Sequence, residues 1–169
     1  DAGSWRMTLL NSEVDGMVRL NDDPDAPLEI VLDNLNLISD GALGDPLLGL
    51  TSEDLLPADV LIRSVYWDGE DYGRWQFTVQ PNDEFVRLTN LMAQSKGMLI
   101  DVKDGLHWYP ASDAPYSKFE GLVRVEDMRA CLAAWGYASG LEGENFGFQT
   151  TMEWPGSPLH IDLDRVKGS

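Results

Sequence analysis

Apolar and polar residues alternate along most of this chain, which predicts strands with one apolar face and one polar face. The alternation is clearest near the C-terminus, where residues of one parity read Phe146, Phe148, Thr150, Met152 and Trp154. A turn sequence follows at 155–158, and a second alternating run covers 159–163. Successive side chains of a strand point to opposite faces of a sheet. Residues 146–163 are therefore predicted to form a hairpin.

The same alternation predicts strands upstream. They are expected at 5–10, 14–20, 28–32 with an extension toward 37, 60–67, 74–80, 85–92, 98–102, 106–109 and 116–123. In the 60–67 run, Val60, Ile62 and Tyr66 are expected on one face, and Leu61, Val65 and Trp67 on the other. Such a strand would be covered on both sides. Turn sequences such as Asp68-Gly69 favour hairpins, so the strands are expected to form an antiparallel meander.

One amphipathic helix is predicted near 126–135. Met128, Cys131, Leu132 and Trp135 recur at helical spacing, with Glu126 and Asp127 expected in the first turn and Gly136 as the stop. Residues 38–58 contain several Gly and Pro, and predict a long irregular excursion with one short helical turn after Ser52. We expect a single β-rich domain over 1–169. Because the chain begins at Asp1 rather than Met, we expect it to be a piece of a longer protein.

The single helix leaves much of the apolar face uncovered. About ten strands at about 4.8 Å spacing would span about 48 Å, whereas a ten-residue helix is about 15 Å long. The remainder of the face must meet a second sheet, close into a barrel, meet another chain, or meet an apolar ligand.

Composition narrows the function classes. The chain has 12 Lys and Arg against 29 Asp and Glu, a net charge of −17, which argues against nucleic-acid binding and against docking on anionic membranes. No run of about 18 apolar residues predicts a membrane span. The single cysteine, Cys131, permits no internal disulfide and lies on the helix's apolar stripe, so it is interpreted as a core residue.

No catalytic chemistry is predicted. The sequence has no nucleophile elbow, phosphate-binding loop or zinc-ligand spacing. His107 and His160 lie inside predicted strands and are interpreted as ordinary strand residues. We therefore predict that the protein is not an enzyme and has no cofactor or metal. Six tryptophans could form a sugar-binding platform, but Trp5, Trp75, Trp108 and Trp154 fall in the apolar registers of their strands, which favours core packing or groove lining.

A set of short motifs, in this order, resembles the C-terminal part of the YhdP group of AsmA-like proteins. They are DNLNL at 33–37, GRWQF at 73–77, SKFEGLV at 117–123, AWGY at 134–137 and WPGSPL at 154–159. The resemblance covers most of the chain and is poorest over 38–58. Each motif consists of strand, turn or helix-end residues and is weakly specific alone, so the resemblance rests on the order of the motifs along the chain.

The resemblance implies a curved antiparallel β-sheet with an apolar groove, from a large envelope protein of Gram-negative bacteria. It implies a periplasmic location, with an inner-membrane anchor in a part of the protein not present here. It also implies phospholipid movement toward the outer membrane, with phospholipid acyl chains and flanking segments of the full-length protein as partners. The family supplies no catalytic residues.

The resulting hypothesis is a segment of an apolar β-groove that carries lipid. The residues expected to line its concave face are Leu28, Ile30, Leu32, Trp75, Phe77, Val79, Phe146, Phe148, Met152 and Trp154, some of which must instead pack under the helix. Two alternatives remain at this stage. One is a structural β-sandwich module of an envelope protein, and the other is a carbohydrate-binding module that uses exposed tryptophans.

Overall fold

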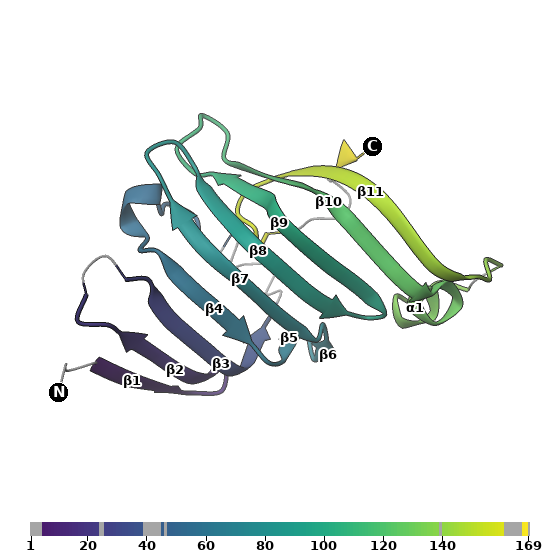
Figure 1. The fold of residues 1–169 in the computed structure, drawn as a ribbon, viewed down its shortest axis with the longest axis horizontal. Helices are drawn as coiled ribbons and strands as arrows, with labels where there is room; N and C mark the ends of the chain where they lie inside the picture. The colour runs from purple at the N-terminus through teal and green to yellow at the C-terminus, as the bar shows by residue number, and fades with distance from the viewer. Residues whose placement is uncertain are drawn as a thin grey trace.

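All strands of the described residues belong to one sheet. The structure is a computed structural model, and it describes residues 5–23, 26–38, 45, 47–138, 140–160 and 167–168. Within these residues twelve strands form a single sheet accompanied by one α-helix (Figure 1). The predicted class, a mainly β fold with one helix, is confirmed.

The strands follow the chain closely, as expected for a meander. They are β1 (Trp5–Leu10), β2 (Val14–Leu20), β3 (Leu28–Leu37), β4 (Ala58–Ile62), β5 (Val65–Trp67), β6 (Glu70–Asp71), β7 (Arg74–Pro81), β8 (Val86–Ser95), β9 (Met98–Tyr109), β10 (Tyr116–Asp127), β11 (Glu144–Pro155) and β12 (Lys167–Gly168). The order across the sheet is β1-β2-β3-β4-β7-β8-β9-β10-β11-β12, with β5 paired to β3 and β6. Neighbours are antiparallel, except that β4 and β5 both run parallel to β3.

The predicted strand at 60–67 is two strands. β4 ends at Ile62 and β5 begins at Val65, because Arg63 and Ser64 break the ladder. The break shifts the alternation by one residue, so Ile62 and Val65 lie in the same buried cluster. The expectation that Val65 faces away from Ile62 was therefore wrong.

The two strands predicted at 98–102 and 106–109 are one continuous strand, β9. The pairing of β9 with both of its neighbours is irregular near the middle of the strand, where Val102 lies. A Cβ added to Gly105 would lie 2.3 Å from Val102 Cγ1, and one added to Gly121 would lie 2.5 Å from Val102 Cγ2. The two glycines on β9 and β10 thus form a notch that accommodates Val102.

Helix α1 (Met128–Ala134) is shorter than the predicted 126–135. Glu126 and Asp127 still belong to β10, so they are not in the first turn as expected. Asp127 is instead the N-cap, and its carboxylate accepts a 3.1 Å hydrogen bond from the Ala130 N–H. Gly136 has φ of +79°, which is the left-handed conformation expected of a helix stop.

The first arm of the predicted C-terminal hairpin is present as β11. β11 extends from Glu144 to Pro155, but Leu159 and His160 lie in a turn rather than a strand. The rest of the predicted second arm, 161–163, lies outside the described residues. On the side of β11 that faces away from β10, the described partner is the short strand β12, which pairs with Met152 and Glu153.

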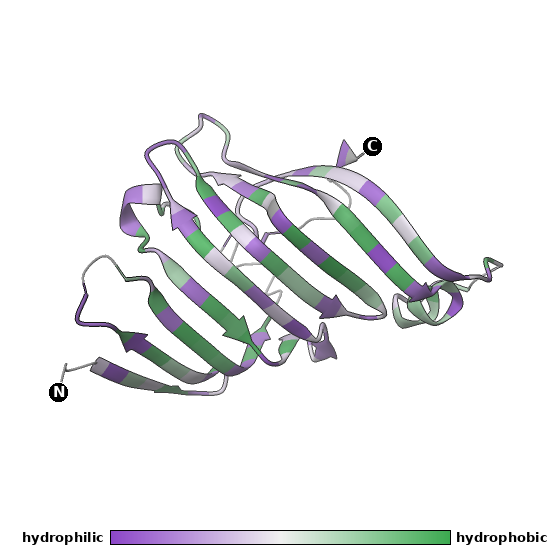
Figure 2. Cartoon of the chain, in the orientation of Figure 1, coloured by the Kyte–Doolittle hydropathy of each residue, from purple (hydrophilic) through white to green (hydrophobic). Residues whose placement is uncertain are grey.

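The core lies on one face of the sheet. One buried cluster lies on β8 to β11 and contains Val86, Leu88, Leu91, Leu106, Trp108, Phe119, Val123 and Trp154. A second, smaller cluster of Leu32, Ile62 and Val65 lies on β3 to β5. Figure 2 shows the alternation of hydrophobic and hydrophilic positions along the strands that places these residues on one side.

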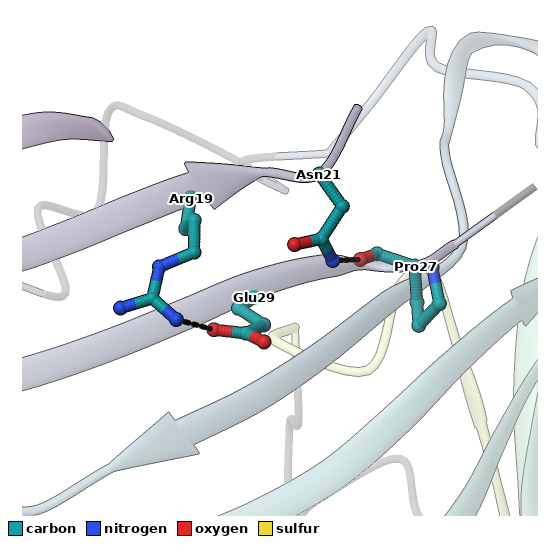
Figure 3. A network of polar contacts seen from close by, with 4 residues as sticks. All are labelled: Arg19, Asn21, Pro27 and Glu29. Carbon is teal, nitrogen blue, oxygen red and sulfur yellow. Dashed lines mark hydrogen bonds and ion pairs between the residues drawn. The ribbon is translucent and has the colours of Figure 1, made fainter. Parts of the chain in front are cut away.

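The other face of the sheet carries polar pairs. Arg19 on β2 is directly opposite Glu29 on β3, and the two form a 2.9 Å ion pair (Figure 3). Beyond them the Asn21 side-chain amide donates to the Pro27 carbonyl at 3.3 Å, which ties together the ends of the β2–β3 connection. We call this side the polar face and the opposite side the apolar face.

Candidate functional site

The pairing register places all ten predicted groove residues on the apolar face. Residues directly opposite each other in neighbouring strands point to the same side of a sheet. One row of opposed residues crosses nine strands, from β1 to β11. It reads Leu9, Gly16, Leu32, Ile62, Trp75, Ala93, Ile100, Val123 and Phe148.

Two more rows run alongside it. The second reads Leu28, Ala58, Val79, Leu88, Leu106, Phe119 and Met152. The third reads Pro81, Val86, Trp108, Ser117 and Trp154. The remaining predicted residues follow, because Ile30 and Phe77 both oppose Val60, and Phe146 opposes Val125. The apolar face is therefore continuous from one side of the sheet to the other.

Exposure varies strongly along this face. The middle is filled by side chains packed on one another, with Leu91 3% exposed and Phe119 4% exposed. Of the ten predicted residues, Leu32 and Trp154 are buried, and Phe146 and Phe148 are exposed at 39% and 43%. The other six are half-buried.

The opposite edge of the sheet also exposes apolar side chains. On β1, Trp5 is 78% exposed and Met7 is 53% exposed, and both belong to the apolar face because Met7 opposes Val18 and Val18 opposes Ile30. These two residues were not among the predicted groove residues. The alternation of Trp5, Met7 and Leu9 was the signal that could have found them.

One end of the strands is covered by the described residues of the 38–58 excursion, namely Asp45 and residues 47–57, which we call the crossing segment. It leads directly into β4, and two of its leucines, Leu47 and Leu55, pack against the larger core cluster. A 3₁₀ turn, η1 (Ser52–Asp54), lies within it, and the Asp54 carboxylate accepts 2.8 Å hydrogen bonds from both the backbone and the hydroxyl of Thr51. These bonds lower the pKa of Asp54. Residues 39–44 and 46 lie outside the described part.

The crossing segment is fastened to the turn that follows β11. The Asp45 carboxylate accepts hydrogen bonds from the Ser157 backbone N–H at 2.6 Å and from the Ser157 hydroxyl at 2.5 Å. Ser157 is fully buried, and its carbonyl accepts a 3.0 Å bond from the indole N–H of Trp154. Ser117, also fully buried, donates to the Gly156 carbonyl at 2.9 Å. Trp154 is therefore a core residue, and its indole is hydrogen-bonded to the serine that joins the crossing segment to this turn.

Helix α1 covers the opposite end of the strands, where β8 turns into β9. Gly97 lies against Cys131, since a Cβ added to Gly97 would be 3.2 Å from the Cys131 Cα. The Lys96 ammonium lies 4.3 Å from the centre of the Tyr72 ring and 5.1 Å from that of Trp135. Lys96 also forms an ion pair with Glu70, and this bond raises the pKa of Lys96.

The cysteine and His107 lie apart, one buried on α1 and the other on the polar face. Burial raises the pKa of the Cys131 thiol, which disfavours the thiolate and agrees with its interpretation as a core residue. His107 lies on the polar face, opposite Arg87 and Lys118, with its ring 5.3 Å from that of Phe85. Across the described residues, no group of three or more His, Cys, Asp or Glu could hold a metal ion.

The described helix is too short and polar to cross a membrane. The described strands form a single sheet whose apolar face is packed in the middle and exposed at both edge strands. The family described as YhdP protein matches residues 1–169, so the chain belongs to the YhdP family, an AsmA-like family of Gram-negative envelope proteins. Comparison with curated proteins and with solved structures finds no match.

Proposed function

We propose that this chain is one segment of a periplasmic, non-enzymatic lipid-transfer protein, in which the apolar face carries phospholipid acyl chains between the inner and outer membranes. The observation that carries the proposal is the nine-strand row from Leu9 to Phe148. The row carries no polar side chain from β1 to β11, and its β11 end, Phe148, is exposed. On β1 the exposed Trp5 and Met7 lie on the same face as Leu9, whereas Leu32, Ile62, Ala93 and Val123 in the middle of the row are buried.

The geometry favours movement along the rows rather than along the strands. The crossing segment lies at one end of the strands and helix α1 at the other, so the uncovered direction runs from β1 to β11. Eight strand spacings of about 4.8 Å make this path about 38 Å long. Burying an acyl chain against such a wall is worth about 0.8 kcal/mol per CH₂, and a wall without directed hydrogen bonds lets the chain slide.

The exposure pattern favours four side chains as the lipid contacts in this proposal. Phe146 and Phe148 on β11, with Trp5 and Met7 on β1, are accessible, whereas Leu32 and Trp154 are sealed in the core. We infer that lipid enters and leaves this segment at its two edge strands. Flanking segments of the full-length protein, one of which carries the inner-membrane tether, would continue the apolar face there.

The two rival functions find less support. A β-sandwich requires a second sheet, and all strands of the described residues belong to one. A sugar platform requires exposed tryptophans close together, and Trp108 and Trp154 are 3% and 4% exposed, while the well-exposed Trp5 lies on the far edge strand.

The proposal is tested by lipid retention in matched variants of one strand. Phe148 and Gln149 are adjacent, exposed residues of β11 that point to opposite faces. We expect phospholipid, counted by native mass spectrometry, to be lost from Phe148→Asp and retained in Gln149→Asp. Equal retention in the two variants would reject the apolar face as the lipid site. Tryptophan fluorescence that does not respond to glycans would reject the sugar platform.

A further inference from the structure

The polar face contains a hollow that the lipid-transfer proposal does not use. It has a volume of about 370 Å³ and lies over β7, β8, β9 and β10. The side chains of Arg74, Gln94, Leu99 and Arg124 line it in one row of opposed residues. These four residues belong to the polar face, although Ala93 and Ile100 of the nine-strand apolar row also border the hollow.

Two arginines stand at the two ends of this row. Arg74 on β7 and Arg124 on β10 are three strand spacings apart, about 14 Å between their Cα atoms. Gly147 opposes Arg124 on β11, so no side chain continues the row on that side. The two arginines therefore flank Gln94 and Leu99 in this row.

Neither arginine is neutralised within the part of the chain that the structure describes. Arg19, Arg63 and Arg129 each form an ion pair with a carboxylate, whereas neither Arg74 nor Arg124 has an ion pair or side-chain hydrogen bond there. One carboxylate, that of Asp101, lines the hollow beside the two arginines.

The floor of the hollow is apolar. Met92 lies in the adjacent row between Gln76 and Asp101, and it is 44% exposed although it is on the polar face. Leu99 beside it is half-buried. A hollow with cationic ends, amide donors from Gln76 and Gln94, and an apolar floor is complementary to an oxyanion that carries a short apolar group.

We propose that this hollow binds a phosphate-bearing ligand, with Arg74 and Arg124 contacting the phosphate oxygens and Met92 and Leu99 contacting its apolar part. Arginine presents a planar fork of donors that matches phosphate oxygens, and two forks converging from opposite ends would hold one phosphate between them. The phosphate can belong to a free phosphate ester or to a lipid headgroup, and the two sources share this recognition chemistry.

The test follows methionine methyl signals by NMR during titration of the 169-residue chain. The probes are inorganic phosphate, glycerol 3-phosphate, and dihexanoyl phosphatidylglycerol below its micellar concentration. Met92 reports on the hollow, and Met152, on the opposite face, reports on the proposed trough. We expect saturable shifts of Met92 with at least one probe. A response to all three probes identifies a simple oxyanion site, and a response to the short-chain lipid alone identifies a headgroup site.

Variants separate specific binding from general charge effects. Arg74→Gln and Arg124→Gln are each expected to weaken binding at Met92 about tenfold or more, because a hydrogen bond to a charged group is worth at least about 1.4 kcal/mol. Arg63→Gln is the control, since Arg63 is engaged by Asp33 on β3 and does not line the hollow. Absence of a Met92 shift with every probe, or a shift that both hollow variants leave unchanged, would overturn the inference. Met152 shifts without Met92 shifts would do the same and leave the lipid-transfer proposal standing.

Discussion

Removal of the Asp45 carboxylate should destabilise the protein more than removal of any other single exposed or half-buried acid that we have described. Asp45 accepts two short hydrogen bonds from Ser157, which is fully buried. Each bond to a charged group contributes about 1.5–3 kcal/mol, and the half-buried position of Asp45 favours the lower value. We therefore expect Asp45→Ala to lower the free energy of unfolding by about 3 kcal/mol.

The measurement is urea denaturation followed by tryptophan fluorescence, since the Trp154 indole is bonded to the same serine. Asp59→Ala is the matched control, because Asp59 is exposed and accepts one bond, from the Thr78 hydroxyl at 2.7 Å. The control should lose about half as much free energy of unfolding, because only one hydrogen bond is removed and Asp59 is exposed. Ser157→Ala, which keeps the backbone N–H bond, should fall between the two. If Asp45→Ala and Asp59→Ala prove equally stable, the crossing segment does not depend on this fastening.

Other sites allow smaller tests. Gly105→Ala should lower the stability of the fold by about 1–3 kcal/mol, because the new Cβ would lie 2.6 Å from the Glu120 carbonyl oxygen. Gly147→Ala is the control, since its Cβ would make an ordinary 3.7 Å contact, and thermal denaturation should show nearly unchanged stability. Lys96→Gln should lower the free energy of unfolding by about 1–2 kcal/mol, because the contacts of Lys96 with two aromatic rings are lost. A variant as stable as the wild type would count against these contacts. Because the pKa of Lys96 is raised, its contribution should persist below the ordinary lysine pKa and disappear as the pH rises through the raised value. Cys131, whose thiol pKa is raised by burial, should react slowly with iodoacetamide at pH 8 and rapidly in urea; fast labelling of the folded chain would contradict its burial.

The strands and the helix were predictable because their signals are local. Period-two alternation gave most of the strands, and the spacing from Met128 to Trp135 gave the helix. The pairing of β3 with β4 was not predictable in the same way. Leu28 and Ala58 are brought together in parallel by the intervening crossing segment, and no local pattern specifies that partner.

The sequence predicts which side chains of the candidate site share one face of the sheet, but it does not predict how exposed each of them is. Alternation within each strand placed Phe148 and Trp154 on one side, but their difference in exposure, 43% against 4%, depends on what covers each. The cover over Trp154 depends on Asp45 and Ser157, which are 112 residues apart. The row that joins Arg74 to Arg124 across four strands is equally non-local.

Photo-cross-linking along β11 tests the central claim most directly. A photoreactive phenylalanine analogue replaces either Phe148, on the apolar face, or Gln149, on the polar face, and the adducts are identified by mass spectrometry in cells that make the full-length protein. We expect phospholipid adducts at position 148 and few at position 149. Equal yields at the two positions, or adducts at 149 alone, would contradict it.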